Sequence, residues 1–249
     1  MTGQSRVYGE NVDIDPTAVA AFFAGRARRA ASAEPLTSVL YQDGNPELAR
    51  ARDQYEKQLI LPELALGEQD AVLDVGCGIG RWAQPVLDAG AHYCGTDFSD
   101  ELLHVARTRI THPKARFVTC PVQALNLETL DQPGGFSRVI IAGVLIYLND
   151  TDLLRALTAV AASAAPRCLI YLREPVATGA RLTLDQHWSS DLEQSYSAVY
   201  RPEAELNSAF GRTLLAAGFA LRMAADLYPA DLNNRADTTQ RYYLLERGR

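Results

Sequence analysis

The 249-residue sequence is poor in cysteine and histidine, with only four of each. The cysteines stand singly at wide intervals, and no C-x-x-C pair occurs that could bind a metal or carry out dithiol exchange. Isolated cysteines of this kind are typical of a reduced, cytoplasmic protein in which small thiol side chains are buried. The sequence therefore favours neither a disulfide scaffold nor a cysteine-based metal site.

Long apolar runs and clustered positive charge are also missing. No run of about eighteen apolar residues could span a membrane, and residues 1–11 lack the basic start and apolar run of a secretion signal. A formal net charge of -6, with the arginines spread along the chain, disfavours a nucleic-acid backbone as the main partner. Because 47% of the residues are hydrophobic and 22% are charged, the composition predicts a globular protein with a substantial core.

Two helices are expected ahead of the core, at residues 16–31 and 46–60. Each begins with a proline that follows an Asp or Asn suited to be the N-cap. Residues 34–45, between them, are predicted to be a loop, and Tyr41 in it is an aromatic residue that a plain linker does not need. We expect residues 1–62 to form a helical lid in which Tyr41 faces the substrate.

From Ala71 onward, short apolar runs alternate with amphipathic stretches, which is typical of βαβ units. Strands are expected at residues 72–75, 93–96, 116–119, 139–142 and 168–172, and helices after Ile79, Asp100 and Thr151. A helix at 203–217 and two closely spaced, antiparallel edge strands follow, at 219–227 and 241–246. The predicted fold for residues 63–249 is a Rossmann-like α/β domain with a seven-stranded, mostly parallel sheet, an antiparallel last strand and helices on both faces. A polar insert at about 173–202 is expected to enter the substrate pocket.

The first buried strand runs into glycines at alternate positions, Gly76, Gly78 and Gly80. Glycine lets a ligand approach the backbone and permits positive φ angles. The spacing differs from the G-x-G-x-x-G pattern that seats a pyrophosphate on a helix N-terminus. Asp74, just before the loop, would repel a pyrophosphate but suits a cofactor that carries a sulfonium and an ammonium group.

Asp97 ends the second predicted strand, where its carboxylate can accept two hydrogen bonds from ribose hydroxyls. Ser99 is the expected N-cap of the helix that follows, which leaves Asp97 free for a ligand. The loop and this strand end together indicate a nucleoside cofactor.

Residues 72–81 and 95–99, with the order of strands and helices over about 56–249, resemble class I S-adenosylmethionine-dependent methyltransferases. The resemblance implies S-adenosyl-L-methionine as cofactor, with S-adenosyl-L-homocysteine as its product. It implies that Asp74 and the loop glycines hold the methionine and ribose parts, that Asp97 binds both ribose hydroxyls, and that Phe98 flanks the adenine. Further cofactor contacts are expected from Cys77, Ser99, Val122, Gln123 and Gly143.

A closer similarity, to the subgroup that methylates protein α-amino termini, rests on residues 78–81, 122–123 and 197–201. In that subgroup the arginine corresponding to Arg81 pairs with the cofactor carboxylate. The subgroup's catalytic histidine and aspartate align here with Tyr147 and Tyr196, which departs from its pattern. The insert around His187 also resembles bacterial methyltransferases of sugar and natural-product pathways.

Methyl transfer requires the acceptor to be held near attack distance and, where the acceptor carries a proton, a base within hydrogen-bond reach. Three candidates stand out. Tyr147 follows the fourth strand, Glu174 follows the fifth, and His187 titrates near neutrality. Core packing of Tyr147, pairing of Glu174 with an arginine, and a surface position for His187 are the structural alternatives.

The acceptor pocket is expected to be lined by Tyr41, Tyr196, Tyr200 and Arg201. Tyrosine rings offer apolar walls with polar tips, and an arginine can bind a phosphate or carboxylate or hold a carboxylate of the fold. Asp185 and His187 are too few ligands for a metal, so none is expected.

The sequence thus predicts methyl transfer to a hydroxyl or amine of a biosynthetic small molecule, such as a secondary metabolite, an antibiotic precursor or a sugar-bearing intermediate. Two alternatives are open: methylation of a protein or peptide α-amine, and a non-catalytic module that binds S-adenosylmethionine. A nicotinamide-dependent oxidoreductase is disfavoured by the glycine spacing and by Asp74. The sequence does not specify the acceptor, the atom methylated or the oligomeric state.

Overall fold

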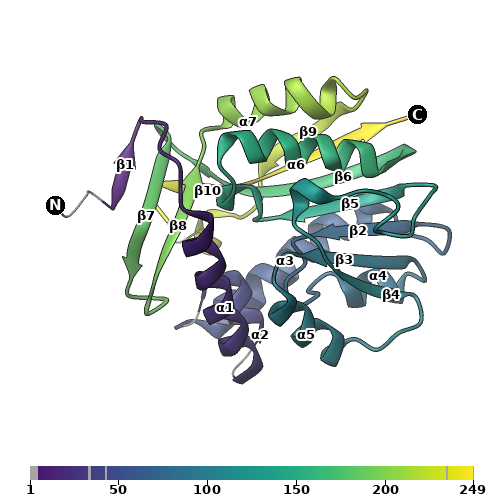
Figure 1. The fold of residues 1–249 in the computed structure, drawn as a ribbon, viewed down its shortest axis with the longest axis horizontal. Helices are drawn as coiled ribbons and strands as arrows, with labels where there is room; N and C mark the ends of the chain where they lie inside the picture. Colours follow the sequence, from purple (N-terminus) through teal and green to yellow (C-terminus); the bar gives the residue numbers. More distant parts are fainter. Residues whose placement is uncertain (1–4, 33–34, 43, 234, 249) are drawn as a thin grey trace.

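The fold is given by a computed structural model, which describes residues 5–32, 35–42, 44–233 and 235–248. Its centre is a seven-stranded sheet in the order β4-β3-β2-β5-β6-β10-β9 (Figure 1). The strands are β2 (Ala71–Val75), β3 (His92–Asp97), β4 (Ala115–Thr119), β5 (Phe136–Ala142), β6 (Ala164–Ala177), β9 (Ala220–Asp226) and β10 (Thr238–Arg247). Strands β2 to β6 pair in parallel, whereas β10 runs antiparallel to both β6 and β9. The predicted fold class is confirmed.

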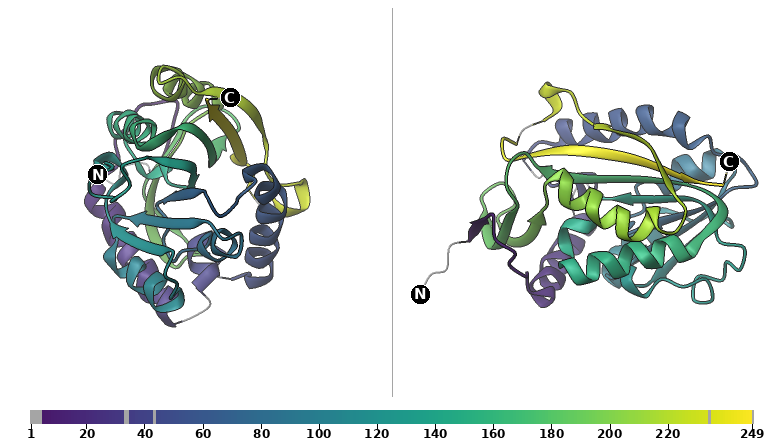
Figure 2. Two further views of the ribbon diagram at one scale, coloured as in Figure 1. Left: turned by 90° about the vertical axis from the view of Figure 1, so that its right-hand side faces the viewer. Right: turned by 90° about the horizontal axis from the view of Figure 1, so that it is seen from above.

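Helices cover both faces of this sheet (Figure 2). They are α3 (Pro46–Leu64), α4 (Ala83–Asp88), α5 (Asp100–Arg109), α6 (Asp150–Ser163) and α7 (Glu203–Phe210), the last continued by a π-helical turn at Gly211–Leu215. One apolar core lies between the sheet and the α6–α7 layer, and a second lies between the sheet and α3 and α4. Alternate residues of the strands supply the two cores, as expected for a sheet buried on both faces.

The helix starts follow the capping chemistry of the sequence. The Asn45 side chain accepts a hydrogen bond from the Leu48 amide at 3.0 Å, and Ser99 accepts one from the Leu102 amide at 3.2 Å. Helix α3 continues beyond its predicted end at residue 60. Ile60 and Leu64 are fully buried, and their i, i+4 spacing gives the extra turn an apolar face on the sheet.

Two segments differ from the sequence prediction. Within residues 34–45, predicted as a loop, Pro35–Leu40 forms helix α2, whose first residue is a proline suited to that position; residues 34 and 43 lie outside the described residues. The insert at 173–202 contains two strands that pair with each other, and the first of them also pairs with a strand near the N-terminus. They form a separate sheet in the order β1-β7-β8, from β1 (Arg6–Tyr8), β7 (Leu182–Ser189) and β8 (Gln194–Tyr200).

The small sheet and α1 (Pro16–Ser32) lie at the carboxyl edge of the parallel strands (Figure 1). Helix α1 packs against α2, α5 and β8. Ligands of open α/β sheets bind at this edge, so the fold brings residues from both ends of the chain to the predicted site. No helix among the described residues is long and apolar enough to cross a bilayer.

Candidate active site

A cavity of about 370 Å³ opens where the carboxyl ends of β2, β3, β4, β5 and β6 meet α1, α2 and β8. Its size is within the range of pockets that bind small molecules. Of the predicted cofactor contacts, the lining includes Asp74, Gly76, Cys77, Gly78, Arg81, Asp97, Phe98, Val122, Gln123 and Gly143. The predicted residues thus converge on one cavity, although they come from four separate strand ends.

The glycine loop forms the floor of this cavity. Gly76 and Gly78 have φ angles of 63° and 55°, a region that glycine adopts without strain. A Cβ on Gly76 would lie 2.5 Å from a methyl carbon of Val144, so a side chain there is also excluded by packing. The exposed backbone at Gly76 can therefore be approached closely by a ligand, and the buried Gly78 belongs to the same lining.

Two buried carboxylates flank the loop. Asp97 accepts the Gly78 amide and the Ser99 amide, each at 2.9 Å, and burial raises its pKa to about 6. Asp74 accepts the Tyr93 hydroxyl at 2.6 Å, and burial raises its pKa to about 7. Each carboxylate retains unused lone pairs at the cavity, which suits ribose hydroxyls at Asp97 and an ammonium group at Asp74.

Phe98, the predicted adenine contact, is 42% exposed at the cavity. Its ring meets the ring of Phe23 edge to face, with centroids 5.5 Å apart. Val122 and Gln123 lie in the same lining. A flat base can be flanked here by apolar groups, with the Gln123 amide available to its edge.

Two predicted cofactor residues do not line the cavity. A Cβ on Gly80 would lie 2.8 Å from the Ile110 side chain, so this glycine provides close packing behind the loop. The Ser99 hydroxyl caps α5 and also donates to Glu101 at 2.9 Å. Both residues support the loop and the strand end rather than face the cavity.

Arg81 enters the cavity wall from a buried charge cluster. Its guanidinium pairs with Asp53 at 2.7 Å and with Glu56 at 2.8 Å, both on α3. Glu56 also accepts Arg173 at 3.3 Å and the Tyr171 hydroxyl at 2.6 Å. Burial alone would raise the pKa of Glu56, but the two arginines bring it to about 2. The cluster fixes both guanidiniums at the cavity, where they can meet a carboxylate.

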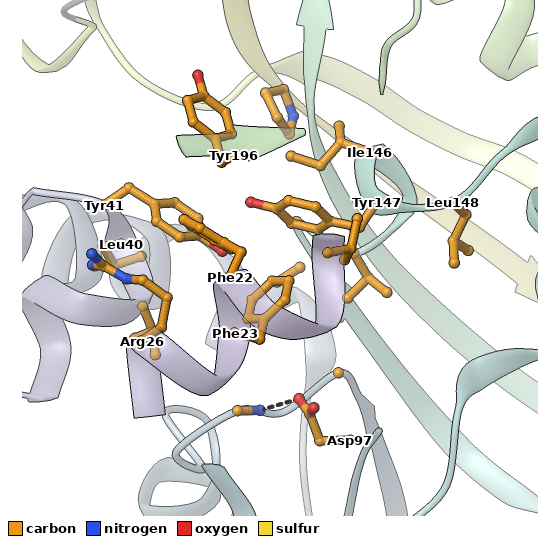
Figure 3. A pocket seen from close by; sticks show the side chains of 18 of the residues that line it. Phe22, Phe23, Arg26, Leu40, Tyr41, Asp97, Ile146, Tyr147, Leu148 and Tyr196 are labelled. Carbon is orange, nitrogen blue, oxygen red and sulfur yellow. Dashed lines mark hydrogen bonds between the residues drawn. The ribbon is translucent and has the colours of Figure 1, made fainter. Parts of the chain in front are cut away.

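The rest of the cavity is lined by aromatic rings, which we term the aromatic chamber: Phe22, Phe23, Tyr41, Tyr147, Tyr196 and Tyr200. Phe22 lies at its centre (Figure 3), with its ring centroid 5.9 Å from those of Tyr41 and Tyr196 and 6.4 Å from that of Tyr147. Phe23 connects the chamber to Phe98, the predicted adenine contact, because its ring contacts those of both Tyr147 and Phe98.

Tyrosines supply the hydroxyls of the chamber. Tyr41 and Tyr147 line the same part of the cavity, and the oxygens of Tyr196 and Tyr200 are 3.4 Å apart. Burial raises the pKa of Tyr41 to about 12 and that of Tyr147 well above its usual value. Tyr41 and Tyr147 are therefore neutral at physiological pH. Tyr41 has a φ of 55°, a strained angle for a side chain of this size and one often found at functional sites.

Glu174, His187 and Arg201 are not brought to the cavity. The Glu174 carboxylate accepts the amides of residues 144, 145 and 146 at 2.8, 2.9 and 3.3 Å, and burial raises its pKa to about 7. His187 lies on β7, with Nδ1 3.0 Å from the Ser5 hydroxyl. Arg201 is buried and binds Asp150 and two backbone carbonyls. Their positions in the sequence, near the carboxyl edge of the sheet, did not determine which way these side chains point.

The sequence placed α1 in the lid but did not single out any of its residues. Phe22, Phe23 and Arg26 of this helix all line the cavity, and Figure 3 shows Phe22 and Phe23 among the other aromatic rings. The spacing of these residues is the same as that of any helix face that packs on a core. The adjacent aromatic pair Phe22 and Phe23 was therefore the only sequence signal that pointed to a binding site. Among the described residues, no group of three or more His, Cys, Asp or Glu side chains could hold a metal ion.

Comparisons with known proteins agree with this geometry. Residues 72–167 match the family model of a methyltransferase domain. A ubiquinone biosynthesis O-methyltransferase of Rhizobium etli is 33% identical over 102 residues, which are 41% of this chain and 39% of that protein. The match to this curated relative therefore spans well under half of its length.

Two solved structures share nearly the whole fold. The 1,6-didemethyltoxoflavin-N1-methyltransferase of Burkholderia thailandensis superimposes with a TM-score of 0.66 and 17% identity, over 98% of this chain and 95% of that one. It holds 1,6-didemethyltoxoflavin and S-adenosylhomocysteine. The magnesium protoporphyrin IX methyltransferase of Synechocystis PCC 6803, with bound S-adenosylmethionine, superimposes with a TM-score of 0.60 and 19% identity, over 96% of this chain and 100% of that one. Residues 72–167, which include the glycine loop, thus match a methyltransferase domain, and the chain shares with the two solved structures a fold whose sheet has one antiparallel strand.

Proposed function

We propose that the protein transfers a methyl group from S-adenosyl-L-methionine to a hydroxyl or amine of a biosynthetic small molecule. The observation that carries this proposal is the continuity of the cavity, which is lined by the glycine loop and Asp97 at one end and by the aromatic chamber at the other. Phe23 touches both ends. A nucleoside donor and an acceptor bound there would be neighbours, as a near-attack geometry requires.

The residues at the nucleoside end fit the cofactor. Asp97 would accept the ribose hydroxyls, Asp74 would face the methionine ammonium, and Arg81 and Arg173 are placed for its carboxylate. Gly143, with a φ of 76° and the Arg173 guanidinium 3.1 Å from where its Cβ would lie, keeps the wall free of a side chain. When bound, S-adenosylmethionine supplies a methyl group on a positively charged sulfur, which departs as a neutral thioether.

The remaining work falls to the chain's own side chains. Helix α1 acts as a lid in this proposal, since it carries Phe22 and Phe23 over the chamber and excludes water from it. Tyr147, which keeps its proton, holds the acceptor by a hydrogen bond. Glu174 acts at a distance by fixing the Leu145–Tyr147 turn that carries Tyr147. Acceptor contacts from Tyr41, Tyr196 and Tyr200 complete the chamber.

Relatives support a small acceptor. The Burkholderia enzyme is named for 1,6-didemethyltoxoflavin, the Synechocystis enzyme for magnesium protoporphyrin IX, and the Rhizobium protein for ubiquinone biosynthesis. A secondary metabolite is the acceptor class that these names and the enclosed chamber suit best. Methylation of a peptide α-amine is the second candidate, favoured by Arg81 at the cofactor end and by the similarity of residues 197–201.

Methyl transfer is tested by incubating purified protein with S-adenosylmethionine and two panels, one of hydroxylated or amino-substituted small molecules and one of short peptides with free N-termini. We expect S-adenosylhomocysteine to form with the first panel only. Turnover of peptides alone would favour the second candidate. Binding of S-adenosylmethionine without turnover on either panel would indicate a non-catalytic binding module.

A further inference from the structure

The walls of the aromatic chamber come from four separate elements. Helix α1 supplies two phenylalanines, and one tyrosine follows α2. The Leu145–Tyr147 turn supplies Tyr147, and β8 supplies the remaining two tyrosines. Rings thus surround the space from several directions, and the central ring, Phe22, is only 2% exposed. Aromatic faces and edges add about 0.5–1.5 kcal/mol to the binding of another ring beyond area burial, which a saturated ring of equal size does not receive.

The polar groups of the chamber are neutral hydroxyls. The oxygens of Tyr196 and Tyr200 lie 3.4 Å apart, and Tyr41 and Tyr147 belong to the same lining. A phenol can both donate and accept, so each of these hydroxyls can form a hydrogen bond with a ligand. Such groups complement oxygen or nitrogen atoms on the edge of a ring, and they offer no counter-ion to a charged acceptor.

Positive charge already occupies the aromatic faces. The Arg26 guanidinium carbon lies 5.9 Å from the Phe22 ring centroid and 5.5 Å from that of Tyr41. Among the described lining residues, the carboxylates are Asp74 and Asp97 at the nucleoside end and Asp152, which pairs with Arg155 at 3.5 Å. An ammonium group placed in the chamber would therefore meet a cation and neutral phenols, without a carboxylate of the chamber itself.

From these contacts we infer that the acceptor is a flat, uncharged aromatic ring with oxygen or nitrogen atoms on its edge, and that Phe22 determines this selectivity. The inference rests on the proposed methyl transfer. In the reaction, a lone pair of the ring's oxygen or nitrogen forms the bond to the methyl carbon. The carbon–sulfur bond breaks with its electron pair left on sulfur, and the proton of the acceptor passes to solvent.

Three matched probes test the inference by titration calorimetry on the complex with S-adenosylhomocysteine. They are 4-methylcatechol, its saturated analogue 4-methylcyclohexane-1,2-diol, and dopamine, which adds an ammonium group to the catechol. We expect 4-methylcatechol to bind about tenfold more tightly than either of the others, as one ring contact of about 1.4 kcal/mol implies. Equal or tighter binding of the saturated diol or of dopamine overturns the inference, and so does a failure of 4-methylcatechol to bind.

Phe22→Leu gives the second arm, with Phe210→Leu as the matched control. Both phenylalanines are 2% exposed, but Phe210 packs against Tyr243 in the core of the sheet. Phe22→Leu should weaken the binding of 4-methylcatechol about two- to tenfold and leave the binding of the saturated diol unchanged. Phe210→Leu should change the affinity for neither compound. Equal losses in the two variants would show that Phe22 acts only through stability.

Tyr196→Phe removes a single hydroxyl and serves if Phe22→Leu does not fold. It should weaken the binding of 4-methylcatechol about two- to tenfold, because one hydrogen bond is lost. The affinity for S-adenosylhomocysteine should not change. Unchanged affinity for the catechol would contradict the hydroxyl role. If the wild-type protein binds no S-adenosylhomocysteine, the proposed methyl transfer itself fails, which separates that failure from the failure of the acceptor inference.

Discussion

The amide of Gly78 donates a 2.9 Å hydrogen bond to the carboxylate of Asp97, so the glycine loop and the end of β3 are fixed to each other. The other carboxylate oxygen accepts the Ser99 amide. Two hydrogen bonds leave about half of the acceptor capacity of a carboxylate unused. Asp97 thus orients the loop and still has lone pairs for the hydroxyls of a ribose.

This geometry predicts pH-dependent nucleoside binding. Burial raises the pKa of Asp97 to about 6. Only the ionised carboxylate accepts two hydroxyl donors, so affinity should be full above about pH 7 and fall as the pH drops through about 6. 5′-Methylthioadenosine is the suitable ligand, since it lacks the amino-acid part that would also report on Asp74. Titration calorimetry across this range measures the effect.

Asp97→Asn is the control for the pH effect. It keeps an oxygen for the Gly78 amide but does not titrate, so its weaker binding should be independent of pH. Asp97→Ala should lose about 1–3 kcal/mol of binding free energy. Wild-type affinity that stays constant between about pH 5 and about pH 8 would refute the assignment of Asp97 to the ribose.

Glu174, His187 and Tyr147 should behave differently although all three were candidates for a base. Glu174→Gln retains one acceptor oxygen for the amides at 144–146 but loses the other, so we expect lower stability by about 1–3 kcal/mol together with lower turnover.

His187→Asn should keep full turnover, because this side chain contacts Ser5 away from the cavity. Tyr147→Phe should raise the KM for the acceptor.

Urea unfolding and steady-state kinetics at saturating S-adenosylmethionine distinguish these roles. A Glu174→Gln variant of wild-type stability with lost turnover would mean that Glu174 takes part in the chemistry. Loss of turnover in His187→Asn would likewise contradict its position on β7.

Glu56 should be among the most important residues for stability. It lies between Arg81 and Arg173 with no exposed surface, so Glu56→Gln leaves two buried guanidiniums poorly compensated. Removal of one partner from a buried ion pair costs about 3–5 kcal/mol, and we expect a loss of this size in urea unfolding near neutral pH. Glu63→Gln, which removes an exposed partner of Arg222, should cost no more than about 1 kcal/mol.

The effect of Glu56 should depend on pH with a definite sign. The pKa of Glu56 is lowered to about 2, so its contribution is present above the ordinary carboxyl range and is lost as the pH falls toward 2. Wild type and Glu56→Gln should therefore converge in stability in acid. A difference that stays constant down to about pH 2 would show that the charge of Glu56 is not responsible.

The central sheet could be predicted because its strands are short apolar runs that end in turn residues, as at 72–75, where every residue is buried. The residues at the glycine-loop end of the cavity could be predicted from the sequence for a related reason. Asp74 and Asp97 belong to strand ends, and parallel strands place such ends at one edge. Sequence position alone was enough to bring them together.

The small sheet and the inner wall of the chamber could not be predicted in the same way. Strand β1 has three residues, too few for a periodic pattern, and its pairing with β7 joins positions about 180 apart in sequence. Phe22 belongs to a helix whose apolar face is indistinguishable in sequence from a core face. Glu174 and Arg201 lie near the correct edge, but the neighbouring backbone groups that bind their side chains were not visible in the sequence.

Titration calorimetry of the purified protein with S-adenosylmethionine, S-adenosylhomocysteine and NADPH tests the cofactor assignment most directly. Above the Asp74 pKa of about 7, we expect one-to-one binding of both sulfur nucleotides and no binding of NADPH, because the ionised carboxylate at the glycine loop repels a pyrophosphate. Binding of NADPH without binding of either sulfur nucleotide would contradict the assignment.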